Sequence, residues 1–377
     1  MQVLNLKDTK NLYNGNDEIL ELYAGEKILY KKVEENEYLM TYGKMENNEY
    51  TSNGVKFLHP FNLSEVYYID TGFPVFSIAY MGNDVFALTN RKDQYVYIYK
   101  LNRDNNNFEL KDTIEHYTID YTYNMYLDEA IQIVFYYNKN LYFLRGVKYS
   151  FDIIKINYDI INFNSRKATI AYNSDNDSIS SPPIYNNSPS YYEGSFQIID
   201  NYFLISDKNS KVISTFKILE DGNIERVGYA RVYSYDNAYL LNNGNFLITN
   251  YKINSDSETI GLGLFKEDIL VKEIYKDSFT GCSPYSKTCY FNNKYYINRN
   301  GYIYEYDNNL KTIKKINNYN ESFSIQISKE EIIYLMSIIN TYENKNYSYL
   351  NTCNSNFSYQ FESISTSSYS VIEPIIF

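Results

Sequence analysis

Short apolar runs that each follow a polar turn recur along this chain, and this recurrence limits the folds that it can adopt. A period of roughly 40 to 50 residues, with four short strands in each unit, is typical of a β-propeller. The chain therefore predicts an all-β fold, a β-propeller of about seven four-stranded blades. Six or eight blades stay open, because the first and third units are poorly delimited. The seven runs are Glu37–Thr41, Val85–Thr89, Leu141–Leu144, Tyr202–Ile205, Phe246–Thr249, Tyr295–Ile297 and Ile332–Met336.

The clearest repeated unit runs from Phe73 to Ile114. Polar turns, among them Gly82-Asn83, separate its apolar runs. The run Tyr95–Tyr99 is wholly apolar or aromatic, as expected for a strand with a neighbouring blade on each face. The four strands of this unit are expected at Phe76–Tyr80, Asp84–Thr89, Tyr95–Leu101 and Phe108–Ile114.

Two other stretches repeat this scheme, and the C-terminal end supplies a last strand. Gly194–Val227 contains three apolar runs and an Asp221-Gly222-Asn223 turn, and Cys289–Ile316 is a compact copy. Ser370–Phe377 is too short to form a blade. We expect it to pair with a strand of the first blade, which would also cover a free sheet edge. Gly261-Leu262-Gly263 lies within a predicted strand pair and indicates close packing rather than a phosphate-binding loop.

The composition agrees with β structure and excludes several partners. The chain has 377 residues, with 46 Tyr, 21 Phe and no Trp, and Tyr favours half-buried pleated surfaces. A net charge of −11 opposes contact with phosphates, so we expect no nucleic acid. No apolar run is long enough for a signal peptide or a membrane span, so we expect no membrane insertion. The abundant Asn can reflect nucleotide composition and is not used as a fold signal.

The residues that catalysis or metal binding would need form no recognisable motif. The two histidines, His59 and His116, have no Gly-x-Ser-x-Gly elbow to act with. Cys282, Cys289 and Cys353 are odd in number, lack CxxC spacing and have no nearby His. The sequence therefore predicts no enzyme, no metal site and no cofactor.

A polar insertion at 173–194 interrupts the repeat. It is longer than a connection needs to be, and long loops on a rigid scaffold often carry recognition. A surface loop without a ligand is the alternative. The candidate receptor-binding residues in the insertion are Tyr185, Tyr191 and Tyr192, and the other loop tyrosines considered are Tyr233, Tyr235 and Tyr285.

Residues 1–33 do not have the pattern of a blade. We expect them to form an N-terminal attachment segment, followed by the propeller at 34–377. The pattern Leu-Tyr-x-Gly occurs at Leu12–Gly15 and again at Leu22–Gly25, each time followed by polar residues and an Ile. A β-favouring pair, a Gly able to adopt positive φ and a return to an apolar residue predict a tight hairpin. Two small hairpins bury little surface alone, so they need a partner.

This tandem repeat resembles the chain ends of tail or baseplate proteins of tailed bacteriophages, prophages and phage-tail-like bacteriocins. The resemblance covers about residues 3 to 31. It implies a structural component of the virion tail or baseplate, assembled in the host cytoplasm, with the propeller displayed for host-surface binding or tail assembly. The implied partners are other tail subunits, reached through the N-terminus, and a host cell-surface glycan or protein. The expected particle-docking face comprises Leu12, Tyr13, Leu22, Tyr23 and Ile28.

Two other functions stay open. The first is a non-viral propeller that serves as a protein-interaction scaffold, with the N-terminal hairpins folded into the first blade. The second is a glycan-active propeller enzyme, which would need a pair of carboxylates in a central pocket. The sequence alone does not identify such a pair among its 46 acidic residues.

Overall fold

The computed structural model is all β in the residues that it describes. The described residues are 12–14, 17–19, 21–24, 27–31, 37–42, 45–46, 49–50, 53–58, 65–75, 77–90, 95–115, 131–147, 150–165, 168–173, 194–207, 211–267, 269–277, 289–291, 293–299, 302–317, 324–327, 333–340, 346–353, 364–365 and 371–376.

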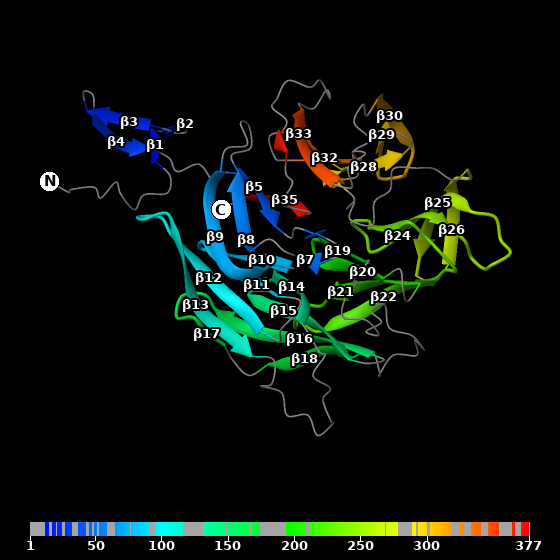
Figure 1. The fold of residues 1–377 in the computed structure, drawn as a ribbon, viewed down its shortest axis with the longest axis horizontal. Coiled ribbons are helices and arrows are strands. Elements are labelled where there is room, and N and C mark those ends of the chain that lie inside the picture. The colour runs from blue at the N-terminus through cyan, green and yellow to red at the C-terminus, as the bar shows by residue number, and fades with distance from the viewer. Residues whose placement is uncertain are drawn as a thin grey trace.

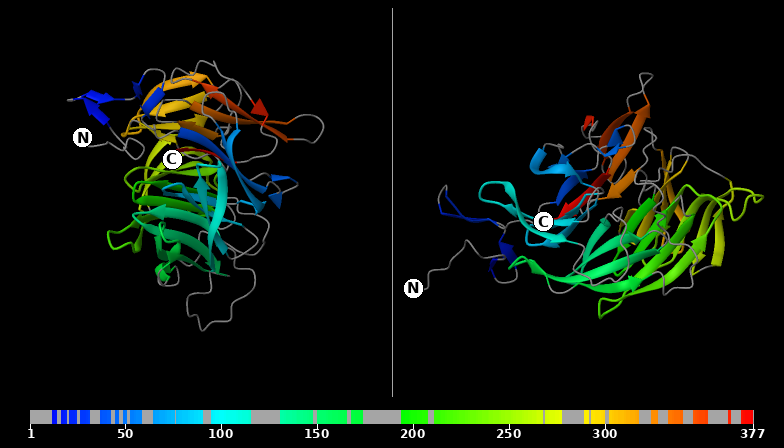
Figure 2. Two further views of the ribbon diagram at one scale, coloured as in Figure 1. Left: turned by 90° about the vertical axis from the view of Figure 1, so that its left-hand side faces the viewer. Right: turned by 60° about the horizontal axis from the view of Figure 1, so that its bottom comes forward.

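In the described part of the chain, seven antiparallel sheets of four or five strands make up the propeller body, and they are numbered here as blades 1 to 7 in chain order. Figures 1 and 2 show the sheets following one another around a common centre, from the blue blade 1 to the orange blade 7.

The first four blades hold seventeen of the strands. Blade 1 contains β35 (Val371–Ile376), β5 (Glu37–Tyr42), β8 (Asn53–Leu58) and β9 (Glu65–Pro74), and blade 2 contains β10 (Ser77–Gly82), β11 (Val85–Thr89), β12 (Tyr95–Asn102) and β13 (Asn107–Glu115). Blade 3 contains β14 (Ile131–Tyr137), β15 (Asn140–Val147), β16 (Ser150–Asp159), β17 (Asn164–Ser165) and β18 (Thr169–Asn173), and blade 4 contains β19 (Gly194–Ile199), β20 (Tyr202–Asp207), β21 (Val212–Ile218) and β22 (Ile224–Arg231).

The other three blades have four strands each. Blade 5 contains β23 (Asn237–Leu240), β24 (Phe246–Tyr251), β25 (Ile260–Lys266) and β26 (Ile269–Tyr275), and blade 6 contains β27 (Cys289–Phe291), β28 (Lys294–Arg299), β29 (Tyr302–Tyr306) and β30 (Thr312–Asn317). Blade 7 contains β31 (Ser324–Ile327), β32 (Ile333–Asn340), β33 (Asn346–Cys353) and β34 (Ile364–Ser365).

The predicted apolar runs are confirmed as strands, and all seven occupy the same place in their blades. Each run forms the second strand of its sheet, from β5 in blade 1 to β32 in blade 7. The predicted pairing of the C-terminal segment is confirmed as well. β35 pairs antiparallel with β5, with Val371 opposite Tyr42 and Ile376 opposite Glu37.

The N-terminal repeats form the predicted hairpins. β1 (Leu12–Asn14) pairs with β2 (Asp17–Ile19), and β3 (Glu21–Ala24) pairs with β4 (Lys27–Lys31). Neither hairpin joins any of the seven sheets, and the views of Figures 1 and 2 show both beside the propeller body. A third small hairpin, β6 (Met45–Glu46) with β7 (Glu49–Tyr50), lies between β5 and β8 in the sequence.

The core lies between neighbouring blades. One cluster joins blades 2 and 3 through Val96, Ile98 and Phe143, and another joins blades 4 and 5 through Ile213, Phe246 and others. Both faces of a middle strand are therefore buried, as β11 shows by burying all five of its residues.

Hydrogen bonds from polar side chains join the innermost strands of neighbouring blades. The Gln197 amide of β19 donates to the Ala238 carbonyl at 2.9 Å and accepts from the Leu240 N–H at 3.0 Å, both on β23. Between β10 and β14, the Ser77 hydroxyl donates to the Val134 carbonyl at 3.3 Å and accepts from its N–H at 3.2 Å. These side chains satisfy backbone groups that an innermost strand would otherwise leave unpaired.

Buried tyrosines join blades at the tight turns. The Tyr142 hydroxyl of β15 donates to the Gly222 carbonyl in the β21–β22 turn at 3.0 Å. Burial, together with the charge of Asp221, raises the pKa of Tyr142 to about 12. Tyr295 of β28 donates to Asn242 in the β23–β24 turn at 2.8 Å, and burial raises its pKa to about 12. Each of these hydroxyls is therefore held as a neutral donor over the physiological pH range.

Candidate functional site

Several connections between strands meet at one end of blades 3 to 5. Asn173, the last residue of β18, pairs with Asp152 near the start of β16. Gly194, the first residue of β19, pairs with Asp207 at the end of β20. The first residue of the predicted insertion 173–194 therefore lies beside the start of β16, and its last residue lies beside the end of β20.

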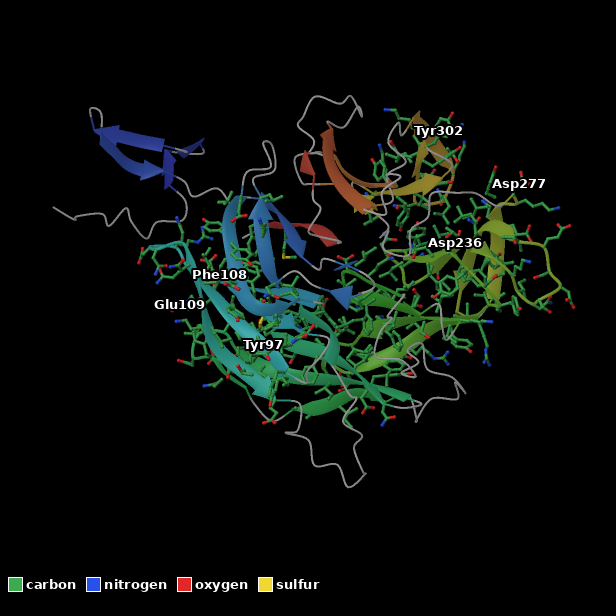
Figure 3. All side chains as sticks on the ribbon, viewed as in Figure 1. Tyr97, Phe108, Glu109, Asp236, Asp277 and Tyr302 are labelled. Carbon is green, nitrogen blue, oxygen red and sulfur yellow. The ribbon has the colours of Figure 1, made fainter. Side chains whose placement is uncertain are left out.

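Tyr233 lies at this end and is exposed over 47% of its surface. It follows β22 in the connection to blade 5. The Lys211 ammonium, from the connection before β21, lies 4.3 Å from the centre of the Tyr233 ring. This cation–π contact fixes the ring in place. Figure 3 labels Asp236, which belongs to the same connection between β22 and β23.

Ile253 is the second apolar side chain at this end, and 52% of its surface is exposed. The Tyr233 N–H donates to the Lys252 carbonyl at 2.7 Å, and Ser234 forms an isolated bridge with Lys252. Tyr233 is thereby held beside the backbone that carries Ile253.

The turn after Ile253 is built from its own hydrogen bonds. Asn254 accepts from the Asp256 N–H at 3.1 Å, and the Ser257 hydroxyl accepts from the Asn254 N–H at 3.1 Å. Such a turn fixes the backbone without tertiary contacts. We name Lys211, Tyr233 and Ile253 the Tyr233 surface.

The loop tyrosines that the sequence suggested differ in their exposure. Tyr233 is exposed, as predicted for a recognition residue, whereas Tyr235 is buried in the core between blades 4 and 5. Tyr285 and the candidate receptor-binding residues Tyr185, Tyr191 and Tyr192 lie outside the described residues. Their role stays a prediction.

The predicted particle-docking residues all lie on the N-terminal hairpins. Leu12 and Tyr13 are on β1, Leu22 and Tyr23 on β3, and Ile28 on β4. Successive residues of a strand point to opposite faces, so Leu12 and Tyr13 do not share a face. Tyr23 and Ile28 are register partners and do share one.

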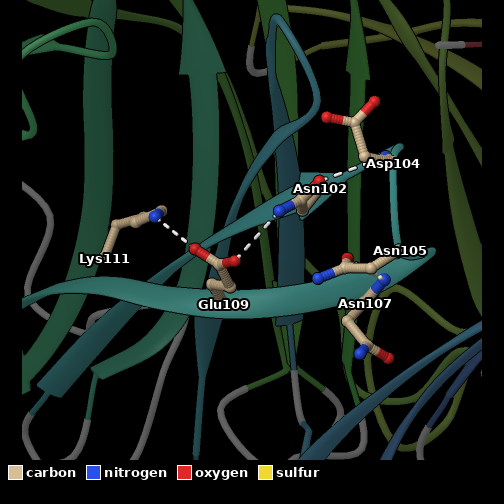
Figure 4. A network of polar contacts seen from close by, with 6 residues as sticks. All are labelled: Asn102, Asp104, Asn105, Asn107, Glu109 and Lys111. Atoms are coloured by element: carbon tan, nitrogen blue, oxygen red, sulfur yellow. Dashed lines mark hydrogen bonds and ion pairs between the residues drawn. The ribbon is translucent and has the colours of Figure 1, made fainter.

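A polar network on blade 2 was a second candidate for a site (Figure 4). Glu109 accepts from the Asn102 amide at 3.2 Å and forms an ion pair with Lys111. The hydrogen bond from Lys111, and then that from Asn102, lowers the pKa of Glu109. The negative charge of the Glu109 carboxylate is thus balanced by Lys111 within the β12–β13 hairpin, which indicates a structural role.

The described residues also bear on metal binding and carboxylate chemistry. Among them there is no group of three or more His, Cys, Asp or Glu that could hold a metal ion. Two carboxylates of the described part are buried, Asp152 on β16 and Glu305 on β29. Both strands are third in their blades, and Glu305 pairs with Lys294 at 2.6 Å. No helix in the described part is long and apolar enough to cross a membrane.

Solved structures similar to this chain are β-propellers, and this protein has the same fold. A protein from Lactobacillus plantarum matches 90% of this chain and 99% of its own, with 8% identity and a TM-score of 0.50. A protein of unknown function from Bacteroides caccae and the periplasmic gluconolactonase of Pseudomonas aeruginosa cover the same shares, at 10% and 7% identity and TM-scores of 0.47 and 0.46. No family model and no curated protein matches the sequence. At such identities the likeness establishes the fold alone.

Proposed function

We propose that this protein is a non-catalytic propeller scaffold that holds a partner protein at the Tyr233 surface. The observation that carries the proposal is the exposure of Tyr233 and Ile253 on two segments joined by a backbone hydrogen bond, with Lys211 over the Tyr ring. Tyr is enriched in protein interfaces because its ring is apolar and its hydroxyl can bond at the rim. Rigid connections between packed blades hold these side chains in a fixed arrangement.

A photo-crosslinking amino acid at position 233, introduced in cells of the source strain, tests this proposal. We expect one discrete adduct with a partner protein, and we expect it to disappear when Ile253→Asp is added. The same amino acid at Leu110, an exposed position on β13, is the control and should give no such adduct. Identical adducts from both positions would contradict the proposal.

The place of this scaffold in a phage tail stays a prediction that rests on the N-terminal repeats. Immunogold labelling of induced particles tests it directly. Gold at the tail tip would support it, whereas unlabelled particles with the protein free in the cytosol would contradict it.

A further inference from the structure

The outermost strand of blade 6 is basic, although the protein carries a net charge of −11. Lys311 precedes β30, and Lys314 and Lys315 lie on it, with no acidic residue between positions 308 and 318. All five residues from 311 to 315 are exposed. β30 lies at the edge of its sheet, so no strand of the described residues pairs with its outer backbone edge. We name residues 311–315 the β30 strip.

An apolar side chain lies at the centre of the β30 strip. The register changes between Glu305, which pairs with Lys314, and Tyr306, which pairs with Thr312. Ile313 is therefore the extra residue of a β-bulge, and 51% of its surface is exposed. The strip thus offers one protruding aliphatic side chain with cations on both sides.

The lysines of the strip differ in their surroundings. Lys315 lies over the Tyr302 ring, 3.6 Å from its centre, which holds it against blade 6. Lys311 and Lys314 form no ion pair with any residue in the described part of the chain. Two cations are therefore available to an acidic partner.

The N-terminal hairpins have the complementary sequence. Between positions 12 and 26 the chain has four carboxylates, Asp17, Glu18, Glu21 and Glu26, and no Lys or Arg. Leu12 and Ile19 are register partners, as are Asn14 and Asp17, so these four positions share one face of the β1–β2 hairpin. That face combines two aliphatic residues with a carboxylate.

We propose that the β1–β2 hairpin of one copy of this protein docks on the β30 strip of a second copy. The hairpin belongs to none of the seven sheets, and a two-stranded hairpin is marginal without a partner. Asp17, on the same face as Leu12 and Ile19, meets Lys311 and Lys314, and the two aliphatic residues meet Ile313. The contact joins two different surfaces, so it repeats head to tail from copy to copy. This proposal does not depend on the Tyr233 surface.

The salt dependence separates this contact from general attraction. Copies that each carry a net charge of −11 repel one another, and salt weakens that repulsion. A contact between the basic strip and the acidic hairpin weakens with salt instead. Association that falls between about 50 mM and about 500 mM NaCl therefore indicates the complementary contact.

Sedimentation velocity of the full-length protein tests the proposal through a charge exchange. Lys311→Glu with Lys314→Glu should abolish association, and Asn14→Lys with Asp17→Lys, both on the docking face, should do the same. Mixing the two variants in equal amounts should restore association, because each then offers the other an oppositely charged surface. The control is Lys266→Glu with Lys272→Glu on the exposed part of β25 and β26, which should associate as the unchanged protein does.

Three results would overturn the proposal. The first is an unchanged protein that stays monomeric at low salt at all concentrations. The second is a mixture of the two variants that stays monomeric although circular dichroism shows both to be folded. The third is an equal loss of association in the control, which would assign the effect to overall charge. If the lysines of the β30 strip serve only to keep this edge strand from pairing with other chains, the mixture of the two variants should stay monomeric.

Discussion

Gln197 on the innermost strand of blade 4 and Lys314 on the outermost strand of blade 6 are both polar residues of β-strands, but their surroundings differ. Gln197 is buried and its amide makes two hydrogen bonds to the backbone of blade 5. Lys314 is exposed and forms no ion pair in the described part of the chain. Near the centre, polar side chains join blades, whereas on the outer strand they are left available for solvent or a partner.

The difference predicts where substitutions will be costly, and the largest effect is expected at Gln197. Gln197→Leu keeps the size of the side chain but removes its hydrogen bonds to two buried backbone groups, the Ala238 carbonyl and the Leu240 N–H. Two buried groups of this kind should lower the free energy of unfolding by about 3 kcal/mol. Urea unfolding followed by circular dichroism measures it, with Lys314→Leu as the control on the outer strand. A loss at Gln197 no larger than in the control would remove the distinction between the two regions.

Alkaline pH should weaken the joint between blades 3 and 4. The pKa of Tyr142 is about 12 in the folded protein and about 10 in the unfolded chain, so the folded state holds the proton more tightly. The contribution of protonated Tyr142 to the free energy of unfolding is complete below pH 10 and is lost as the pH rises through 12. Two pKa units correspond to about 3 kcal/mol of unfolding free energy.

Tyr142→Phe isolates this contribution. It should cost about 1 kcal/mol at neutral pH, since the hydrogen bond to Gly222 is lost. It should also make unfolding less sensitive to pH between 10 and 12, and Tyr295 should keep part of that sensitivity in the variant. Urea midpoints measured across this range check both effects. The same pH slope in both proteins would mean that Tyr142 is not a buried donor.

A substitution in the turn that Tyr142 contacts should cost less than the loss of about 3 kcal/mol expected from ionisation of Tyr142. Gly222 has a φ of +79°, and a Cβ there would lie 3.0 Å from Cδ of Lys155 and 3.1 Å from the Tyr142 hydroxyl. Gly222→Ala should cost about 2 kcal/mol, through backbone strain and crowding together. Gly82→Ala is the matched control, because Gly82 has a φ of +88° with nothing within 4 Å of such a Cβ. It should cost about 1 kcal/mol by backbone strain alone, and equal losses in thermal unfolding would show that the joint does not crowd the turn.

The sequence predicted the strands well because their signals are local. An apolar run between turn residues identifies a strand from a few neighbouring positions, and β5 and β20 begin at the predicted residues. The joints between blades could not be predicted in this way. Gln197 and Ala238 are 41 positions apart, and Ser77 and Val134 are 57 positions apart. No local sequence pattern in one segment therefore identifies its partner in the other.

The abundant Asn, not used as a fold signal, has a structural role that sequence reasoning missed. In many turns an Asn or Asp side chain accepts a hydrogen bond from the backbone N–H two residues later, which stabilises the turn. The signal was present as Asn and Asp between apolar runs. These turns begin at Asp70, Asn102, Asn105, Asp159, Asp221, Asn243, Asn254 and Asp307.

The candidate site was only partly predictable. The length of the insertion and the exposure of Tyr233 could be anticipated, since both depend on local polarity. The Tyr233 surface could not, because Lys211, Tyr233 and Ile253 come from three separate connections.

The smallest effect on stability is expected on the β30 strip. Lys311→Glu with Lys314→Glu removes no hydrogen bond or ion pair of these side chains in the described part of the chain, so the free energy of unfolding should change by no more than about 0.5 kcal/mol. Urea unfolding at a concentration where the protein is monomeric measures it, with Gln197→Leu as the opposite extreme. A loss near that of Gln197→Leu would place these lysines among the residues that hold blade 6 together. A negligible loss, in a variant that no longer associates, would assign them to contacts between molecules and keep the two regions distinct.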